Sequence, residues 1–329
     1  MSKPAADSSR LAAVFFCISL NPAIDTRLVL NRLLPGRVNR VVEVYRTPGG
    51  KAAHVAMALT GLGAAPTWIG FAGGAIGSEL LAGLRSLKIE SVSVPTVQSS
   101  RVNLEILDTH GEVTEILEPG GTITQSEWNN FQQTCSKAFQ VAAANKIAVI
   151  SGSLPPGVPD DACSTLTSAA HSANCLAFVD SSGQALSKAL PAEPDFVKVN
   201  REEAEVATQI AVHDPISAAL AVRKLLDQGA KSAAVSLGEG GLVAVQHRDG
   251  PAIHAWTDPL HPKSTVGCGD SALAGFAFAA TSGLSFERSL ALAVACGTAN
   301  CLATMPARIQ KQDVSRIEQQ VHNEMLKEK

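Results

Sequence analysis

Aromatic side chains and clustered charge are both scarce in this sequence of 329 residues. Phe, Trp and Tyr make up 4% of the chain, and the formal net charge is −3 with no conspicuous run of Lys and Arg. Binding to nucleic acid or to an anionic membrane requires a concentrated basic face, so we expect neither partner. With 46% hydrophobic residues and 26 glycines, the chain can form one large α/β domain or two, packed through Ala, Leu and Val.

Cysteine usage gives no sign of a disulfide framework or of a structural metal. The seven cysteines are odd in number and contain no C-x-x-C pair, which is typical of reduced thiols in a cytoplasm. Cys296 and Cys301 have no His or second Cys at the spacing that zinc sites use. We therefore expect a cytoplasmic protein without a zinc site.

Long hydrophobic runs are also missing near the start of the chain. The apolar segment 11–20 has ten residues, and a membrane-spanning helix needs roughly 20. Asn21-Pro22 follows this segment, where a signal peptide would have small residues for cleavage. A buried first strand is predicted at 12–20 of this segment, with residues 1–11 as a flexible leader.

From residue 124 onward, helical and strand patterns alternate regularly. Strands are predicted at 146–151, 175–180, 196–200 and 232–237, separated by helices at 160–172, 183–190, within 201–210 and at 216–229. Such alternation predicts a mostly parallel sheet with helices on both faces. An antiparallel edge at 241–246 and 254–257 and helices at 124–143, 270–282, 286–303 and 312–325 complete the pattern.

Two β-hairpins interrupt the first third of the chain. Strands at 27–31 and 38–46 lie too close together for a crossover helix, so they are predicted to pair antiparallel. Strands at 101–108 and 112–118 are joined by Thr109-His110-Gly111, a tight-turn sequence. Between them come a helix at 52–62, a strand at 66–72 and a helix at 76–87. The hairpins predict a small β element beside the main sheet.

The stretch from Ser264 to Ser271 contains Gly267-Cys268-Gly269-Asp270 and runs directly into an apolar helix. Glycines at a helix start expose free N–H groups, and the helix dipole adds positive potential, so an anion would be stabilised there. One interpretation makes Asp270 a catalytic base beside an anion hole formed by Gly267, Cys268 and Gly269. The other makes Asp270 a helix cap after a glycine turn, which this stretch alone favours.

A second glycine-rich helix start, Gly49-Gly50-Lys51, also has two interpretations. The glycines can bring the backbone close to a ligand and Lys51 can supply a positive charge, or Lys51 is a solvated side chain. His54 lies on the same helical face as Lys51, although a helical His is commonly structural. Asp25 follows the first strand, where α/β sheets bind ligands, and Arg101 begins a hairpin as either a phosphate clamp or a surface residue.

Taken together, these motifs resemble the ribokinase-like (PfkB) carbohydrate kinases, and within them the 1-phosphofructokinase and tagatose-6-phosphate kinase branch. The resemblance runs from Val14 to Ala303. It rests on the order of the following motifs: Asn21-Pro22-Ala23-Ile24-Asp25, Val38-Asn39-Arg40-Val41, Gly49-Gly50-Lys51, Ser151-Gly152-Ser153-Leu154-Pro155, Lys198-Val199-Asn200 with Glu203, Ser236-Leu237-Gly238-Glu239-Gly240-Gly241 and Gly267-Cys268-Gly269-Asp270.

The resemblance implies a ribokinase-like three-layer α/β/α sandwich with a mostly parallel central sheet and a small β-sheet lid. The α/β core would comprise residues 12–25, 47–93 and 119–329, and the lid residues 26–46 and 94–118. Because such lids often pair between subunits in relatives, a homodimer is expected. The implied reaction is transfer of the γ-phosphoryl group of ATP to a phosphorylated ketohexose, with Mg²⁺ as the second cofactor. Fructose 1-phosphate and tagatose 6-phosphate are the first candidate substrates, followed by fructose 6-phosphate.

Roles for individual residues also follow from the resemblance. Asp270 would be the base, with the backbone of Gly267, Cys268 and Gly269 as the anion hole. Asn200 and Glu203 would organise Mg²⁺ through water. The sugar site would contain Asp25, Gly49, Gly50, Lys51, His54, Arg101 and Asn103, with Lys51 and Arg101 as partners of the existing phosphate. The nucleotide site would contain Lys198, Asn200, Glu203, Ser236, Gly238, Gly241, Thr265 and Asn300.

The chain departs from the family pattern at four positions. His54 replaces the usual Asn and Ala52 the usual Gly, which alters or removes a sugar contact, because imidazole and amide groups present donors and acceptors differently. Val199 replaces Pro. Cys268 replaces Ala. The favoured interpretation is a small side chain that fills space; the alternative is a thiol of lowered pKa that reacts with oxidants.

Three alternative functions are open at this stage. A kinase of an unphosphorylated sugar or nucleoside would keep Lys51, although Asn21–Asp25 and Arg101–Asn103 favour a phosphosugar. A non-catalytic sugar or nucleotide binder would have no need of the base Asp270. An NAD-dependent oxidoreductase is disfavoured because no G-x-G-x-x-G follows the first strand.

Overall fold

Two sheets form the framework of the protein. The structure, a computed structural model, describes residues 13–109, 111–258 and 262–327. The leader expected at residues 1–11 lies outside the described residues. Within them, ten strands form the large sheet in the order β14-β13-β12-β11-β10-β9-β8-β1-β4-β5. Their bounds are β1 Val14–Ser19, β4 Thr67–Ala72, β5 Glu90–Pro95, β8 Lys146–Ser151, β9 Leu176–Asp180, β10 Phe196–Asn200, β11 Ala233–Ser236, β12 Leu242–Val245, β13 Ala252–Trp256 and β14 His322–Met325.

Pairing in the large sheet is parallel from β11 through β5 and antiparallel from β11 to β14. The central strands are almost wholly apolar because helices cover both of their faces; all six residues of β8, for example, are buried. The predicted mostly parallel α/β sheet with a closing antiparallel edge is therefore confirmed.

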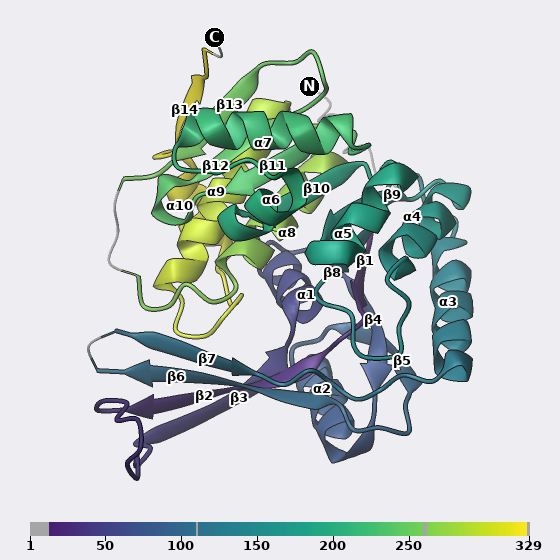
Figure 1. The fold of residues 1–329 in the computed structure, drawn as a ribbon, viewed down its shortest axis with the longest axis vertical. Coiled ribbons are helices and arrows are strands. Elements are labelled where there is room, and N and C mark those ends of the chain that lie inside the picture. Colours follow the sequence, from purple (N-terminus) through teal and green to yellow (C-terminus); the bar gives the residue numbers. More distant parts are fainter. Residues whose placement is uncertain (1–12, 110, 259–261, 328–329) are drawn as a thin grey trace, which may run out of the picture.

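Two groups of helices form the outer layers of the sandwich (Figure 1). One buries Phe131, Leu166 and Val222 against the sheet and consists of α3 Gln125–Phe139, α4 Ala162–Ser172, α5 Gly183–Ala189, α6 Arg201–Thr208 and α7 Pro215–Asp227. The other buries Leu80 and Leu273 on the opposite face and consists of α1 Lys51–Gly61, α2 Gly74–Ser86, α8 Cys268–Ser282, α9 Phe286–Leu302 and α10 Lys311–Glu318. Short 3₁₀ turns lie at Leu190–Ala192 and Gly238–Gly240.

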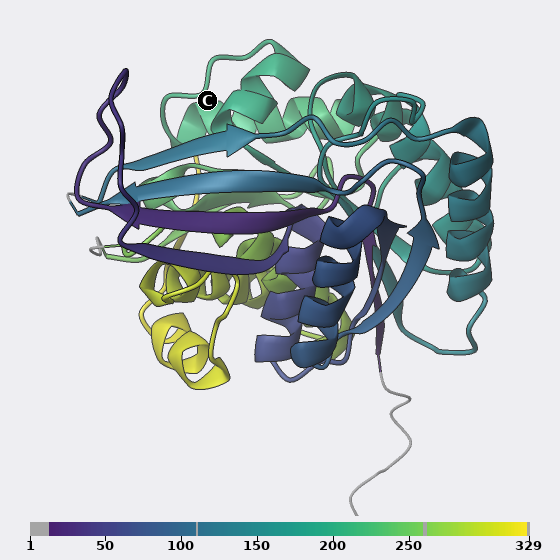
Figure 2. The same cartoon turned by 90° about the horizontal axis from the view of Figure 1, so that it is seen from below.

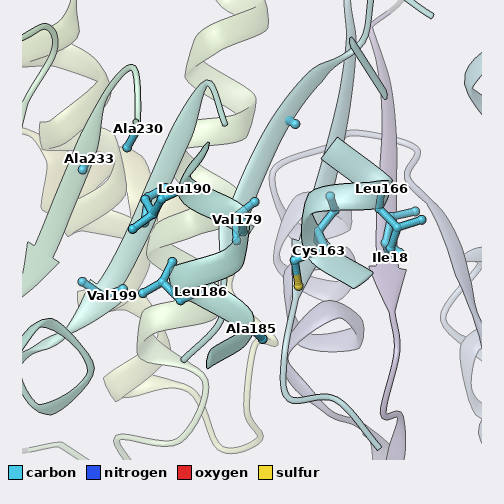
Figure 3. Close-up of a cluster of buried hydrophobic side chains, with 14 of the residues drawn as sticks. Ile18, Cys163, Leu166, Val179, Ala185, Leu186, Leu190, Val199, Ala230 and Ala233 are labelled. Atoms are coloured by element: carbon cyan, nitrogen blue, oxygen red, sulfur yellow. The ribbon is translucent and has the colours of Figure 1, made fainter. Parts of the chain in front are cut away.

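Part of the first core is visible in Figure 3, where Cys163 and Leu166 of α4 lie near Ile18 of β1. Leu186 of α5 and Leu190 fill the next stretch of the same layer, over the strands that carry Val179 and Val199. Small and branched side chains dominate this layer, as the composition predicted. This packing holds in place the carboxyl ends of the strands, where the sequence places the candidate site.

The small sheet contains β2 Ala23–Leu30, β3 Glu43–Gly49, β6 Arg101–Asp108 and β7 Val113–Leu117 in the order β3-β2-β6-β7. Both predicted hairpins are antiparallel, and β2 joins them by pairing parallel with β6. The sheet extends to one side of the body in Figure 1, and Figure 2 shows its strands from below. Because β2 begins at Ala23, Asp25 lies inside a strand of this sheet, and the strand predicted at 27–31 begins four residues earlier.

The prediction of one helix over residues 312–325 is wrong in its second half. Helix α10 ends at Glu318, and β14 then pairs antiparallel with β13, with Met325 opposite Ile253. An edge strand such as β13 presents unpaired backbone groups that a following segment can satisfy. This long-range pairing outweighs the local helical preference of the segment.

No helix in the described ranges is both long and apolar enough to cross a bilayer.

Candidate active site

A cavity of about 940 Å³ opens at the carboxyl edge of the large sheet. Ser19, Ser151, Asn200 and Ser236, the last residues of β1, β8, β10 and β11, line it. The first turns of α1 and α8 complete its wall. Open α/β sheets bind ligands at this edge, where strand ends and helix N-termini converge.

The start of α8 forms one wall of this cavity. Gly267 is the N-cap residue, with φ 82° and ψ 0°, a left-handed conformation that favours glycine. The helix begins at Cys268, so Asp270 lies in its first turn and is not the N-cap. A Cβ at Gly269 would stand 2.7 Å from Nζ of Lys198. The Cys268 N–H donates to the Thr265 carbonyl over 3.2 Å. The N–H groups of Gly267 and Gly269 and the buried Lys198 ammonium therefore offer positive charge to the same space, which suits an anion.

His54 of α1 lies between two carboxylates. Its Nδ1 forms a hydrogen bond of 2.9 Å with Oδ2 of Asp270. Its Nε2 lies 2.9 Å from Oδ2 of Asp25, a contact that lacks hydrogen-bond geometry and acts as an ion pair. Burial opposes a charge on the imidazole, yet the two carboxylates outweigh it and raise the pKa of His54 to about 10. His54 is thus an imidazolium at neutral pH.

Asp25 is held in place from three sides. Nδ2 of Asn103 donates to its Oδ1 over 2.9 Å, and a Cβ at Gly49 would lie 2.2 Å from its Cγ. Burial opposes ionisation, but the contacts with His54, Asn103 and the Gly50 backbone lower the pKa of Asp25. Oδ1 of Asn103 is buried with no hydrogen-bond partner in the described part of the chain, and Asn103 lines the cavity. This acceptor suits a hydroxyl group of a ligand.

Lys51 lies in an ion-pair network that its sequence context did not indicate. Its Nζ is 2.6 Å from Oδ1 of Asp180 and 2.9 Å from Oε1 of Glu203. Oδ2 of Asp180 pairs with Lys198 over 2.6 Å. Burial would raise the pKa of Asp180, but the two ammonium groups lower it to about 2. Burial likewise opposes the charge on Lys51, and the carboxylates outweigh it, so the pKa of Lys51 is raised.

Asp180 is the functional candidate that sequence reasoning missed. It is fully buried at the carboxyl end of β9. A strand ending in an acid was the signal that drew attention to Asp25, and the same signal at Asp180 could have found it. However, no residue near Asp180 in the sequence indicated that Asp180 would pair with Lys51 or Lys198.

Asn200 and Glu203 form a reciprocal capping box at the start of α6. Oδ1 of Asn200 accepts from the Glu203 N–H, and Oε2 of Glu203 accepts from the Asn200 N–H, both over 2.8 Å. Capping is a structural role for both side chains, although both line the cavity. Across the described ranges, no group of three or more His, Cys, Asp and Glu side chains is placed to hold a metal. Any Mg²⁺ here would be carried by a ligand's phosphates and reached through water, which Mg²⁺ commonly retains.

Arg101 lines the cavity, and its guanidinium forms hydrogen bonds with two backbone carbonyl groups. Its Nε and Nη2 donate to the Asn21 carbonyl over 3.2 and 3.0 Å, and Nη1 donates to the Glu118 carbonyl over 2.7 Å. Burial lowers the pKa of Arg101. Arg101 therefore joins β6 to the end of the first strand, with its remaining N–H groups available to a ligand.

Of the remaining predicted nucleotide residues, Ser236, Gly238, Gly241 and Thr265 line the cavity. Asn300 differs because it is buried and lies behind the wall. Its Nδ2 donates to the Val266 carbonyl over 2.8 Å, and its Oδ1 accepts from the Ala307 N–H. The structure thus gives Asn300 a supporting position beneath the turn that carries Gly267.

A buried acid in the first turn of a glycine-capped helix, near the buried Lys198 and the partly exposed Lys51 at the carboxyl edge of an α/β sheet, defines a phosphotransferase class of site. The chain matches the model of the pfkB family carbohydrate kinases over residues 17–310. It belongs to that family.

Individual relatives show the same likeness. The chain is 32% identical over 294 residues to ATP-dependent 6-phosphofructokinase isozyme 2 of Escherichia coli strain K12, covering 87% of this chain and 92% of the relative. It is 28% identical to 1-phosphofructokinase of Borreliella burgdorferi, covering 88% and 92%. The solved structure of the tetrameric inhibited form of phosphofructokinase-2 from Escherichia coli superposes with a TM-score of 0.85 at 28% identity, covering 94% of this chain and 99% of that one. The predicted family and the ribokinase-like fold class are confirmed.

Proposed function

We propose that the protein is an ATP-dependent kinase that phosphorylates a ketohexose phosphate to a bisphosphate. Fructose 1-phosphate and tagatose 6-phosphate are the first candidates, with fructose 6-phosphate next. One observation carries the proposal: Asp270, in the first turn of α8, and His54 line one cavity, and His54 joins Asp270 to Asp25. The relatives named above are phosphofructokinases, which supports the same substrate class.

Asp270 acts as the base in the proposed reaction. The sugar hydroxyl oxygen attacks the γ-phosphorus of ATP, the bond to the β–γ bridging oxygen breaks, ADP leaves, and the hydroxyl proton passes to Asp270. His54 holds Oδ2 of Asp270, which leaves Oδ1 as the atom that receives the proton. A positioned base contributes about 10²–10⁴ in rate.

The backbone N–H groups of Gly267 and Gly269 stabilise the charge that develops on the transferred group. The ammonium of Lys198 lies against Gly269 and adds to this field without needing to move. Phosphoryl transfer depends mainly on such prearranged charge and on positioning. When bound, Mg²⁺ would neutralise charge on the ATP phosphates, and Asn200 and Glu203 would hold it through water.

The sugar is held by polar groups around Asp25. The carboxylate of Asp25 accepts from one hydroxyl, and the unpartnered Oδ1 of Asn103 accepts from another. Gly49 lets the backbone approach Asp25 closely, Gly50 lines the cavity, and Arg101 and Lys51 balance the existing phosphate. His54 fills the position of the family's usual Asn, and its two ring nitrogens are directed at carboxylates, so it acts on the sugar through Asp25 and Asp270.

A homodimer formed through the small sheet, in which that sheet serves as a lid, accompanies this proposal. Apolar side chains are exposed on the sheet and its connecting loop, including Val42 at 64%, Val44 at 56% and Leu117 at 58%. Exposed apolar groups gathered on one element are typical of an interface. The proposed location is the cytoplasm, which suits the free cysteines of the chain.

A panel of sugars tests the proposal. The protein with ATP and Mg²⁺ is offered phosphorylated ketohexoses and their unphosphorylated forms, ADP release is followed, and products are identified by phosphorus NMR. We expect bisphosphate formation from at least one ketohexose phosphate and a loss of about 10²–10⁴ in kcat for Asp270→Asn. Turnover of unphosphorylated sugars alone would contradict the substrate class. Equal ATP consumption by wild type and Asp270→Asn with every sugar would contradict the proposal that the protein is a kinase.

A further inference from the structure

Two cysteine thiols face each other beside the proposed anion hole. Sγ of Cys268, the first residue of α8, lies 3.2 Å from Sγ of Cys301 near the end of α9. Both side chains line the cavity. They are partly exposed, whereas Cys17, Cys135, Cys163, Cys175 and Cys296 are buried. The pair is therefore the dithiol that a small oxidant can reach.

The surroundings hold both sulfur atoms in place. Nδ2 of Asn300 donates to Sγ of Cys268 over 3.1 Å, which orients the thiol toward α9. The Cys301 carbonyl accepts from the Lys263 N–H over 2.8 Å. A Cβ at Gly297 would lie 3.3 Å from the Cys268 carbonyl oxygen, so glycine keeps α9 close to the start of α8. The approach of the two thiols is thus built into the packing of these helices.

We propose that Cys268 and Cys301 form a reversible disulfide when the protein meets a peroxide, and that this bond switches the site off. The thiolate of Cys301 attacks the peroxide oxygen, forming a sulfenic acid and releasing hydroxide. The sulfur of Cys268 then attacks the sulfenic sulfur, the S–S bond forms, and water leaves with the thiol proton. A dithiol reductant returns two electrons and two protons and restores both thiols.

The order of attack follows from the contact between the two sulfurs. The contact with Cys268 lowers the pKa of Cys301, although burial opposes this. The same contact, together with burial and the nearby Asp270, raises the pKa of Cys268. A thiolate is the nucleophile in thiol chemistry. Cys301 is therefore the attacking group. The alternative of a lowered pKa at Cys268 is wrong, because the pKa of that thiol is raised.

Closure of the bond would disturb the anion hole directly. A disulfide has sulfurs about 2.05 Å apart, so the two residues must approach by about 1 Å from the present 3.2 Å. Cys268 lies between Gly267 and Gly269, whose N–H groups form the proposed anion hole, and Asp270 is two residues away. A misplacement of about 1 Å can lower the rate by roughly 10²-fold. This regulatory effect rests on the proposed kinase function, whereas formation of the bond does not.

Oxidation of the full-length reduced protein tests both parts. After hydrogen peroxide treatment, free thiols are alkylated, the protein is digested, and mass spectrometry searches for a cross-linked peptide pair containing Cys268 and Cys301. We expect this pair to dominate, kinase activity to fall by roughly 10²-fold, and dithiothreitol to restore it. Saturating ATP should slow cross-linking, because both thiols line the cavity.

Each variant serves as its own reference, its activity after peroxide being divided by its activity when reduced. Cys301→Ala and Cys268→Ala should keep most of their own reduced activity, and the buried-site control Cys163→Ala should lose activity as wild type does. Inhibition of wild type without the cross-link, or equal inhibition of Cys301→Ala, would overturn the switch. If no sugar phosphate is turned over, peptide mapping still decides whether the disulfide forms, so failure of the proposed function and failure of this inference are distinguishable.

Discussion

His54 and Asp270 are joined by a hydrogen bond of 2.9 Å between Nδ1 of the imidazole and Oδ2 of the carboxylate. The other ring nitrogen lies equally close to Asp25. One buried cation thus fixes the proposed base relative to the proposed sugar site. An Asn at this position is neutral and would hold the same two carboxylates less strongly.

The first prediction concerns the pH dependence of this contact. The pKa of His54 is raised from 6.5 to about 10, so its contribution to stability is fully present below pH 6.5 and is lost as pH rises toward 10. His54→Asn should therefore lower Tm at pH 6 by a few °C, and the difference from wild type should shrink as pH approaches 10. Thermal unfolding followed by circular dichroism measures this.

The exposed His247 offers a control for the first prediction. His247→Asn removes an imidazole that contacts neither Asp25 nor Asp270, so its Tm difference from wild type should be small at every pH. A His54→Asn difference that stays constant from pH 6 to pH 10 would show that the imidazole is not charged between the two carboxylates.

The second prediction concerns Asp180, which is fully buried between two lysines. Asp180→Asn keeps the shape of the side chain but leaves Lys198 buried without its carboxylate partner. Breaking a buried pair in this way costs about 3–5 kcal/mol of unfolding free energy, which guanidinium unfolding can measure. The matched control is Asp160→Asn, whose pair with Lys188 is half-exposed and should contribute about 1 kcal/mol or less. Equal losses for the two variants would contradict the network.

The third prediction concerns the close approach of Gly49 to Asp25. A Cβ in Gly49→Ala would stand 2.2 Å from Cγ of Asp25, so the carboxylate must move away from His54 and Asn103. Overpacking of this kind costs about 1–3 kcal/mol, and we expect KM for the sugar phosphate to rise roughly tenfold or more while KM for ATP changes little. In the control, Gly36→Ala, the added Cβ meets no atom within 4 Å, and KM for the sugar should stay as in wild type.

Local signals in the sequence were sufficient to predict the glycine-rich helix starts and most strands, because turn geometry and periodicity depend on neighbouring residues. Contacts between distant residues were not predictable in the same way. Lys51 contacts Asp180, 129 positions away in the sequence, and His54 contacts Asp270, 216 positions away. These partners can be identified only when the order of the strands in the sheet is known. The strand at His322–Met325 was missed for the same reason, since it forms only because the edge of β13 is available.

The last prediction concerns the link between the small sheet and the anion-hole turn. Arg27 of β2 and Glu105 of β6 form a buried, two-point ion pair. Oγ of Ser264 donates to Glu105 over 3.0 Å and accepts from the Val266 N–H over 3.2 Å. Ser264→Ala breaks this connection and leaves Oε1 of Glu105 with Arg27 as its donor; losing a hydrogen bond to a buried charged group costs about 1–3 kcal/mol.

If Ser264 transmits the position of the small sheet to the turn before Gly267, Ser264→Ala should lower kcat while KM for the sugar changes little, because no sugar contact is removed. Ser264→Thr retains the hydroxyl and should recover most of the lost rate. Steady-state kinetics on both variants, with Tm as a check on folding, measure the effect. A fall in Tm with unchanged kcat in Ser264→Ala would show that the hydroxyl stabilises the fold without positioning the anion hole.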